Sequence, residues 1–303
     1  MEEKAIDYFR KYESIIPDFE RFLASLLTPQ PYWLRVNTLK ISTQKLIERL
    51  LQKGFVLEQF GNLNAYKIIE KPVKHPGATL EYSLGYYYIQ DLSSMAPVLA
   101  LNPSNEDTVL DMAAAPGSKT TMMAELMRNE GLIVANDINF NRIKSLAGNI
   151  ERLGITDVIL TQKDARVASF GLKFSKILLD APCSGEGVYR KNPWGFKGVN
   201  ERQHRYLGMQ QMRMFKNASN HLEEGGIIVY STCTYHPYEN ESVVKYAIEK
   251  LNLAPIKVKI PIPHTVGVDR WKDETYEFHE DCIRIYPHMV DTGGMFIAVL
   301  AKE

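Results

Sequence analysis

The sequence predicts an α/β protein in which a doubly wound parallel sheet follows a small N-terminal α+β module. Strands and helices alternate from about residue 106 onward, which is typical of a parallel sheet covered by helices on both faces. The segment 176–180 is almost entirely apolar, as a strand buried on both faces should be. The length of 303 residues suggests two domains at about 150 residues each.

The first 80 residues differ in pattern from the rest of the chain. Apolar residues recur at helical spacing over 6–26, and Thr28-Pro29-Gln30-Pro31 should end that helix. A linker with prolines and a glycine over 71–77 marks a boundary, so we assign 1–80 to an N-terminal module and 81–303 to a second domain. Between helix and linker, the pattern predicts a strand over 32–37, a helix over 43–53, and strands over 55–57 and 65–69.

The rest of the chain contains the alternation itself. Each predicted strand is a short run rich in branched apolar residues, and turn residues separate it from the next helix. A last apolar run, 294–300, predicts a late strand. In order, we expect strands at 108–111, 131–137, 158–160, 176–180 and 226–231, and helices at 118–129, 140–153 and 201–221.

Composition places the chain among soluble cytoplasmic proteins. A hydrophobic fraction of 45% is ample for a core, which excludes an intrinsically disordered chain. No apolar run approaches the roughly 20 residues that cross a bilayer, and the acidic first residues are unlike a signal peptide. Three cysteines are too few for a disulfide scaffold and too widely spaced for a zinc finger. Basic and acidic residues balance at 36 each, which weakly disfavours a nucleic-acid partner.

The loop after the first strand is a candidate ligand site, because ligands of an open α/β sheet bind beyond the carboxyl ends of its strands. Segment 111–120, D-M-A-A-A-P-G-S-K-T, is made of small residues that let a ligand approach the backbone. Taken alone, it would be an ordinary strand–helix turn. The absence of G-x-G-x-x-G weighs against NAD or FAD, and the absence of G-x-x-x-x-G-K-[ST] excludes a phosphate loop.

Acidic residues stand at the ends of three successive strands, namely Asp111, Asp137 and Asp164. A carboxylate at the second strand can accept hydrogen bonds from both ribose hydroxyls of a nucleoside cofactor. A carboxylate after the third strand can accept one from the amine of adenine. Each acid alone has an ordinary explanation as a helix cap or a solvated turn. The set fits S-adenosylmethionine better than a dinucleotide, because nothing is arranged to hold a pyrophosphate.

Two of the three cysteines follow neighbouring strands. Cys183 lies in D-A-P-C-S-G-E-G after the fourth strand, and Cys233 lies in S-T-C-T after the fifth. A lone cysteine is usually a small buried hydrophobe, and we assign that role to Cys282. Two cysteines at the carboxyl ends of adjacent strands are instead expected to face one pocket, at the same edge as the cofactor loop.

A methyl donor beside a positioned thiolate points to one reaction. Carbon 5 of a pyrimidine is a poor nucleophile until a thiolate adds to carbon 6. Negative charge then develops at ring nitrogen 3, which needs an acid or a held proton, and Asp180 stands three residues before Cys183. A base must afterwards remove the proton of carbon 5, so one cysteine would attack and the other would assist release. The target base must also be out of its stack.

Three motifs give the chain a family resemblance. D-M-A-A-A-P-G-S-K-T, D-A-P-C-S-G-E-G and S-T-C-T-Y-H-P-Y-E-N-E resemble the motifs of the RNA cytosine-5 methyltransferases of the Sun and nucleolar-protein family. The similarity covers nearly the whole chain and implies a Rossmann-like class I methyltransferase sheet with an N-terminal RNA-recognition-like module. It also implies that Cys233 is the nucleophile, that Cys183 assists product release, and that Lys119 lies near the catalytic acid Asp180.

The resemblance implies S-adenosyl-L-methionine as the cofactor and RNA as the partner, and we expect a monomer without a metal. Two departures from the family are mild, since Ala113 replaces a common cysteine and Ser118 a common glycine without removing a catalytic group. Arg142 matches the methyl-donor contacts of the family less closely than the other residues. The implied methyl-donor contacts are Ala113, Ala114, Ala115, Pro116, Gly117, Ser118, Lys119, Asp137, Arg142, Asp164 and Asp180.

Neighbouring functions remain as alternatives. Compact family members of this length resemble archaeal-type tRNA methyltransferases, which favours tRNA over ribosomal RNA. DNA cytosine-5 methyltransferases carry a Pro-Cys-Gln nucleophile, whereas Ser184 follows Cys183 here. Amino-methylating enzymes typically have Asp/Asn-Pro-Pro-Tyr at that strand end. A non-catalytic RNA-binding or ribosome-assembly factor on the same scaffold is the contrasting class, and the intact catalytic residues speak against it. An NAD oxidoreductase lacks its glycine fingerprint.

The overall charge balance hides basic segments. Residues 189–216 hold seven basic residues and one acid directly after the Cys183 motif, and residues 1–80 have a net charge of +3. Basic groups contact phosphates and aromatic rings stack on bases, so both segments are candidate RNA surfaces. Within 189–216, Arg213 and Lys216 fit a solvated helix face better. The candidate contacts are Arg35, Lys40 and Lys45 in the first segment and Tyr189, Arg190, Lys191, Trp194, Phe196, Lys197, Arg202, Arg205 and Tyr206 in the second.

Overall fold

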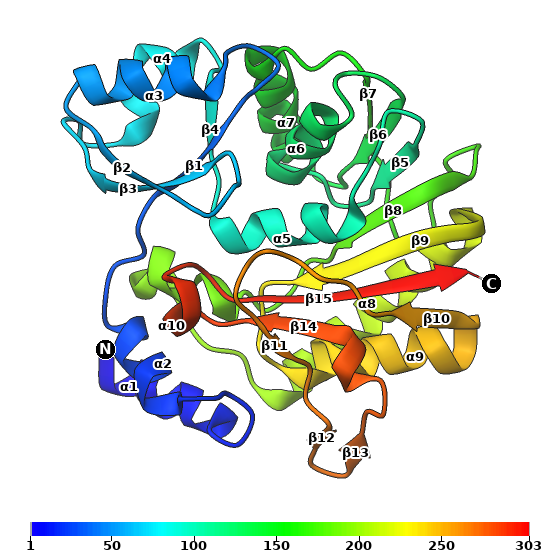
Figure 1. Cartoon of the computed structure of the whole chain (residues 1–303). Coiled ribbons are helices and arrows are strands. Elements are labelled where there is room, and N and C mark those ends of the chain that lie inside the picture. Colours follow the sequence, from blue (N-terminus) through cyan, green and yellow to red (C-terminus); the bar gives the residue numbers. More distant parts are fainter. Residues whose placement is uncertain (1, 303) are drawn as a thin grey trace.

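A nine-stranded mixed sheet forms the centre of the computed structural model, which describes residues 2–302 (Figure 1). The strand order is β11-β14-β15-β9-β8-β5-β6-β7, and β10 pairs with β15 beside this path. The strands are β5 (Thr108–Asp111), β6 (Leu132–Asn136), β7 (Val158–Thr161), β8 (Phe174–Asp180), β9 (Leu222–Thr232), β10 (Leu253–Ile256), β11 (Thr265–Val266), β14 (Cys282–Ile285) and β15 (Met295–Lys302).

Five of these strands, β5 to β9, run parallel and lie where the sequence predicts strands. β5 pairs with β6 on one side and with β8 on the other, so the strand order reverses at β5. The carboxyl ends around such a switch point are where an open α/β sheet binds its ligand. The predicted α/β fold with a Rossmann-like sheet is confirmed in this half of the molecule.

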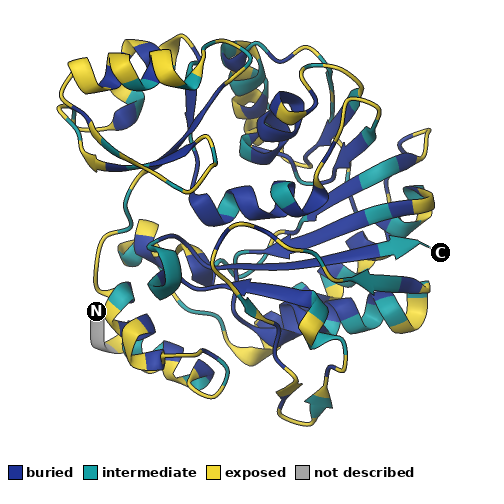
Figure 2. Ribbon diagram, viewed as in Figure 1, coloured by how far each residue is buried: buried dark blue, intermediate teal, exposed yellow. Residues whose placement is uncertain are grey.

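Alternate residues of the central strands enter two separate cores, as a pleated strand requires. In β8, Leu178 packs on the side of α5 and α6, whereas Ile177 and Leu179 pack on the side of α8 and α9. Both faces of β8 are therefore buried in its middle, and the centres of β8 and β9 are dark blue in Figure 2. The covering helices are α5 (Leu92–Leu101), α6 (Ser118–Leu126), α7 (Phe140–Leu153), α8 (Glu201–His221) and α9 (Glu241–Leu251).

The other half of the sheet is antiparallel, which the sequence analysis did not predict. β15 pairs antiparallel with β9, and β14 pairs antiparallel with β15. The apolar run 294–300 predicts a strand, but apolarity alone does not determine strand direction. Smaller elements near this half and its loops are η3 (Glu186–Lys191), η4 (Pro193–Gly195), η5 (Pro237–Glu239), β12 (Arg270–Trp271), β13 (Glu274–Thr275), η6 (His279–Asp281) and α10 (Pro287–Val290).

A second, four-stranded sheet has the order β2-β3-β1-β4 and packs on α3. Its last strand, β4, pairs with β1 although it lies beyond residue 80. The sheet therefore crosses the expected boundary between 1–80 and 81–303, and that division remains a prediction. The elements here are β1 (Trp33–Val36), α3 (Thr43–Gln52), β2 (Val56–Gln59), β3 (Ala65–Glu70), η2 (Pro76–Ala78), α4 (Leu80–Ser83) and β4 (Tyr87–Ile89).

The single helix predicted over 6–26 is wrong. The structure has α1 (Glu2–Phe9), η1 (Arg10–Tyr12) and α2 (Phe19–Leu26), because Pro17 and the left-handed Asp18 interrupt the chain between them. These helices do not pack on the four-stranded sheet. Their apolar faces instead join a cluster that contains aromatic residues from the C-terminal half, and they lie beside α10 in Figure 1. Within 2–302, no helix combines the length and apolarity needed to span a membrane.

Candidate active site

The two predicted catalytic cysteines lie side by side at the carboxyl ends of β8 and β9. These strands pair in parallel with Asp180 opposite Ser231, so the loops that follow leave the sheet together. The Sγ atoms of Cys183 and Cys233 are 3.3 Å apart and share a hydrogen bond. Both cysteines are free thiols and partly exposed, and Cys282 is buried in β14 as expected.

The neighbours of the two sulphurs make them chemically unequal. The hydrogen bond to Cys183 lowers the pKa of Cys233 although burial and the charge of Asp180 oppose this, and the charges of Lys119 and Lys191 lower it further. The same hydrogen bond, together with burial, raises the pKa of Cys183 well above its usual range. The geometry allows either sulphur to donate, and the opposite pKa shifts favour Cys183 as the donor and Cys233 as the acceptor. The pair is suited to hold a thiolate on Cys233 and a proton on Cys183.

Asp180 lies beside this pair and is held by two donors. The ammonium group of Lys119 donates to Oδ2 of Asp180 at 2.6 Å, and the hydroxyl of Ser231 donates to Oδ1 at 2.7 Å. Burial by itself would lower the pKa of Lys119, but the charge and hydrogen bond of Asp180 raise it overall. Lys119 is therefore a stable cation, and the resemblance correctly implies that it lies near Asp180. Together they can present a proton to a ring nitrogen.

A cavity of about 270 Å³ adjoins the cysteine loops and contains several predicted cofactor residues. Asp137 is 2% exposed, and its Oδ2 accepts no hydrogen bond although Arg142 Nη1 is 3.3 Å away. An orphaned buried carboxylate oxygen fits the hydroxyls of a ribose, and the mainly apolar wall fits an adenine ring. The cavity is lined by Met112, Ala113, Asp137, Ile138, Arg142, Lys163, Asp164, Ala165, Arg166, Pro182, Leu207, Gln210 and Met214.

The remaining cofactor residues surround this cavity less directly. Asp164 already pairs with Arg166 at 2.7 Å, so an adenine amine would have to share that carboxylate. Arg142 donates to the carbonyl of Ala115 and so ties its helix to the loop. Of the predicted loop residues 113–119, only Ala113 lines the cavity; Ala114, Ala115, Pro116, Gly117 and Ser118 form the turn into α6, whose first turn carries Lys119.

Comparison with known proteins places this arrangement in a family. A family model described as 16S rRNA methyltransferase RsmB/F matches residues 98–301, which is about two thirds of the chain. The chain belongs to the RsmB/F methyltransferase family. A tRNA (cytosine(49)-C(5))-methyltransferase of Pyrococcus abyssi is 39% identical over 95% of this chain and 94% of that protein. The resemblance found in the motifs is thereby confirmed.

Other relatives in the family are longer proteins. The human 28S rRNA (cytosine(4447)-C(5))-methyltransferase is 36% identical over 95% of this chain, which spans 36% of that protein. The ribosomal RNA small subunit methyltransferase F of Vibrio campbellii is 38% identical over 97% of this chain, which spans 62% of that protein. The relatives are named as RNA methyltransferases, so the chain belongs to a family of such enzymes.

Solved structures support the family assignment along the whole chain. A methyltransferase homolog protein from Pyrococcus horikoshii has a TM-score of 0.84 and 33% identity, with 99% of each chain covered. The structure of NSun6 from Pyrococcus horikoshii with SFG has a TM-score of 0.85 and 27% identity, covering 99% of this chain and 97% of that one. The agreement includes both sheets, so the N-terminal elements are shared with these relatives.

In this methyltransferase, Asp111 does not belong to the cofactor cavity. It is 1% exposed, and its Oδ2 accepts a hydrogen bond from the hydroxyl of Thr120 at 2.7 Å. Burial raises the pKa of Asp111 to about 7, despite that hydrogen bond. Asp111 therefore anchors the first turn of α6 to the end of β5 through this hydrogen bond. Of the three strand-end acids, Asp137 and Asp164 line the cavity, whereas Asp111 binds Thr120 at the start of α6.

Three predicted RNA contacts are wrong because their side chains are buried. Tyr189 is 5% exposed and packs against Phe9 and Phe196 in the aromatic cluster of the N-terminal helices. Arg35 of β1 is 4% exposed and pairs with Glu125 of α6. Arg190 is 5% exposed and pairs with Asp291 at 2.8 Å. A buried guanidinium that is satisfied within the protein is unavailable to a phosphate. Candidates that remain exposed include Lys45, Lys191, Trp194, Lys197, Arg202, Arg205 and Tyr206.

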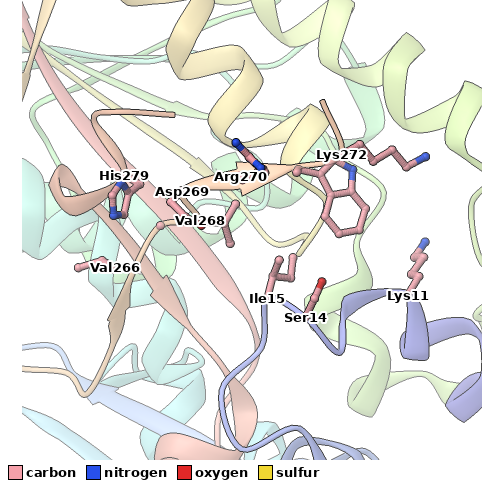
Figure 3. Close-up of a pocket in the computed structure, with 11 residues that line it drawn as sticks. Lys11, Ser14, Ile15, Val266, Val268, Asp269, Arg270, Lys272 and His279 are labelled. Atoms are coloured by element: carbon pink, nitrogen blue, oxygen red, sulfur yellow. The ribbon is translucent and has the colours of Figure 1, made fainter. Parts of the chain in front are cut away.

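A larger surface pocket of about 670 Å³ lies between the N-terminal helices and the β12–β13 hairpin (Figure 3). Lys11 and Ile15 line one side, and Arg270 and Lys272 line the other. Trp271 also lines this pocket. Neither catalytic cysteine lines it, so it is not the place of methyl transfer. Among the residues that the structure describes, no cluster of histidine, cysteine or acidic side chains could hold a metal ion.

Sequence reasoning missed the residues beneath the cysteine loops. Glu186 and Glu239 are completely buried, and His204 lies between them. By its place in the sequence, just before a helix, Glu239 would be an ordinary acid that flanks or caps that helix, but it is buried instead. The signal in the sequence was their place within the two cysteine motifs, because Glu186 lies three positions after Cys183 and Glu239 lies six positions after Cys233.

Proposed function

We propose that the chain transfers a methyl group from S-adenosylmethionine to carbon 5 of a cytosine in tRNA. The observation that carries the proposal is the pair of unequal sulphurs, 3.3 Å apart, beside the Lys119–Asp180 ion pair. No simple structural role requires two partly exposed free thiols and an ion pair at adjacent strand ends. Pro182, which lines the cofactor cavity, directly precedes Cys183, so the cavity reaches the catalytic loop.

The side chains supply the nucleophile and the proton that cytosine needs. The thiolate of Cys233 forms a bond to carbon 6, and the electrons of the 5,6 double bond move toward nitrogen 3. Lys119 and Asp180 hold a proton at nitrogen 3, which makes carbon 5 an enamine carbon able to take a methyl group. S-adenosylmethionine, when bound, supplies that methyl group as an electrophile. Asp137 would hold its ribose hydroxyls through the orphaned Oδ2.

Release requires the loss of the carbon 5 proton and of the sulphur. Once a base has removed that proton, the double bond forms again and the bond from carbon 6 to Cys233 breaks. The thiol of Cys183 stands at hydrogen-bond distance from the departing sulphur. Cys183 is thereby placed to assist departure by stabilising the leaving thiolate. The two cysteines therefore have separate roles in attack and release.

Similarity to a tRNA methyltransferase over nearly the whole of that enzyme supports tRNA as the substrate. The chain spans 94% of the tRNA methyltransferase of Pyrococcus abyssi, but 36% and 62% of the ribosomal RNA enzymes. Ribosomal RNA is the second candidate, because the matching family model is described by that substrate. Methylation of tRNA and of ribosomal RNA would use the same chemistry at the cysteine pair. The two substrates would differ in the parts of the RNA that bind outside this site.

Two cysteine variants test the mechanism. Cys233→Ser should lower methyl transfer to unmodified tRNA by more than about a thousandfold, because a serine hydroxyl is a far weaker nucleophile at neutral pH. RNA binding should change less than about twofold. Cys183→Ala should instead accumulate an RNA–protein adduct that resists denaturant. A labelled methyl donor measures the rate of transfer, and gel analysis under denaturing conditions measures the adduct. Bisulfite sequencing gives the position of the methylated cytosine.

Cys282→Ala is the matched control, because Cys282 is buried in β14 and should be dispensable for transfer. A normal rate in Cys233→Ser would show that the covalent mechanism is wrong. The absence of an adduct in Cys183→Ala would remove its role in release. Methylation of ribosomal RNA fragments but of no tRNA would show that tRNA is the wrong substrate, while the proposed chemistry would stand.

A further inference from the structure

Two fully buried glutamates lie beneath the catalytic loops. Glu186 belongs to the loop of Cys183, and Glu239 belongs to the loop of Cys233. A buried carboxylate is costly unless hydrogen bonds and opposite charges satisfy it. The partners of these two carboxylates therefore show what the glutamates do.

Each glutamate holds the loop to which the other belongs. Glu239 Oε2 accepts a hydrogen bond from the backbone N–H of Ser184, next to Cys183, at 3.0 Å. Glu186 Oε2 accepts one from the hydroxyl of Thr234, next to Cys233, at 2.7 Å, and another from the N–H of Tyr235 at 3.1 Å. We call this reciprocal arrangement of Glu186 and Glu239 the loop clasp.

Side chains of helix α8 contact both glutamates of the loop clasp. His204 Nδ1 is 2.6 Å from Glu239 Oε1, and its Nε2 is 3.5 Å from Glu186 Oε1. Gln211, two turns further along, donates both to Glu239 Oε2 and to the carbonyl of Pro182, each at 3.0 Å. The long helix therefore connects both glutamates and fixes their separation.

The N-terminal helices complete the clasp on the side of Glu186. The hydroxyl of Tyr12 donates to Glu186 at 2.7 Å, that of Tyr8 donates at 2.5 Å, and Lys11 forms an ion pair at 3.3 Å. Burial would raise the pKa of Glu186, but Lys11, His204 and these hydrogen bonds lower it below its usual value. Glu186 is thus a stable anion.

Backbone contacts bring the loops close enough for the clasp to act on the sulphurs. The N–H of Gly187 donates to the carbonyl of Cys233 at 2.7 Å, and Ser184 and Thr234 share a hydrogen bond between hydroxyls at 2.6 Å. A Cβ at Gly187 would lie 2.9 Å from that carbonyl oxygen, so only glycine permits this approach. A small shift of either loop would therefore change the distance between the sulphurs.

We propose that Glu186, Glu239 and His204 are positioning residues that set the separation of the Cys183 and Cys233 sulphurs and so the hydrogen bond between them. They touch neither RNA nor cofactor and act through the loops. The proposal rests on the proposed function, in which Cys233 attacks. Its physical consequence is that the thiolate of Cys233 loses its main stabilisation when the clasp is broken.

Glu239→Gln tests the proposal, because it removes the charge with little change in shape. Alkylation of Cys233 by iodoacetamide is followed against pH without RNA or cofactor, and peptide mass mapping assigns the modified cysteine. We expect the midpoint of the profile to move to higher pH and the rate at pH 7 to fall about three- to tenfold, since only the thiolate reacts. The plateau rate at high pH should remain, because the sulphur stays accessible.

Glu81→Gln is the matched control. Glu81 is also completely buried and ion-paired, to Arg49 and Lys53, but it lies in the module of the four-stranded sheet. It should lose thermal stability and keep the wild-type alkylation profile. If Glu239→Gln does not fold, His204→Gln gives the same measurement, because it removes the link between the glutamates.

A profile of Glu239→Gln that superimposes on that of wild type, with only a lower thermal midpoint, would overturn the proposal and leave the glutamates a stabilising role. Restoration of the profile by Glu239→Asp, with its carboxylate kept, would support it further. Failure of the proposed function appears separately, as methylation by Cys233→Ser, because alkylation requires neither RNA nor methyl donor.

Discussion

At the scale of single residues, the chemistry depends on side chains whose ionisation is set by immediate neighbours. Cys183 and Cys233 have the same side chain, yet their pKa values move in opposite directions, upward for Cys183 and downward for Cys233, because they share a hydrogen bond and have different charged neighbours. The motifs predicted both cysteines and Asp180. They did not predict the burial of Arg35 and Arg190, because the sequence does not show whether an acidic side chain from a distant segment lies next to an arginine.

Asp111 allows a prediction at this scale from the effect of pH. Its pKa is raised to about 7 by burial, whereas an unfolded chain has an ordinary aspartate near 3.9. Such a group stabilises the folded state fully below about pH 4, and the contribution is lost as the pH rises through 7. Each pH unit in this window is worth about 1.4 kcal/mol. Asp111→Asn cannot ionise and should escape this loss.

Thermal unfolding of wild type and Asp111→Asn between pH 5 and 8 measures the effect. The stability of wild type relative to the variant should fall steadily up to about pH 7 and then level off. Asparagine can still accept the hydrogen bond from Thr120, so the difference isolates ionisation. Two stability curves that run parallel over this range would mean that Asp111 is not protonated in the folded protein.

At the scale of elements, periodicity predicted segments well and their interruptions poorly. The helices α7 and α8 have the predicted bounds, 140–153 and 201–221, because strong apolar spacing and capping asparagines define them. The helix expected over 6–26 is broken by Pro17 and Asp18, although its apolar residues continue the pattern on both sides. Strand direction in β14 and β15 was not predictable, because pairing partners lie far away in the chain.

The turn that begins α6 yields a prediction for an element. Gly117 has a φ of 103°, and a Cβ there would lie 2.6 Å from a methyl group of Leu146. Gly117→Ala should therefore cost about 1–3 kcal/mol of stability and displace the loop 113–118. Since this loop leads from the cofactor cavity to Lys119, affinity for S-adenosylmethionine should fall at least about fivefold. Calorimetric titration and thermal unfolding measure the two effects.

Gly225→Ala is the control for the backbone effect alone. Gly225 has a φ of 72° but nothing within 4 Å of an added Cβ, and it precedes the core of β9 far along the chain from the cofactor loop. It should lose stability and retain the affinity for the methyl donor. Equal affinities in both glycine variants would show that the loop geometry does not control cofactor binding.

At the scale of the whole molecule, a net charge of zero conceals a separation of charge. Residues 189–216 have a net charge of +6, and the structure divides this segment into buried and exposed parts. Arg190 is used internally, whereas Lys191, Lys197 and Arg202 remain exposed after the Cys183 loop. Exposed cations such as these can contact phosphates, whereas the buried Arg190 cannot.

Reversal of two exposed charges tests this division. Lys197→Glu with Arg202→Glu should weaken RNA binding at least about tenfold and reduce the slope of its salt dependence by about 2, because each phosphate contact releases counterions. Affinity for the methyl donor should not change. Arg213→Glu with Lys216→Glu, on the exposed face further along α8, is the control of equal charge. Equal salt slopes for the two double variants would contradict the assignment.

The sequence by itself determined the class of fold and the family, and it brought forward the side chains that we propose to react. These follow from short segments, since a buried strand, a small-residue loop and a cysteine motif are each local. Only the tertiary structure decided which polar side chains are exposed, which strands run antiparallel, and how the two cysteine loops are held. Those properties depend on contacts between residues far apart in the chain. Glu186 and Glu239 show this most clearly, because 53 positions separate them and each supports the loop of the other.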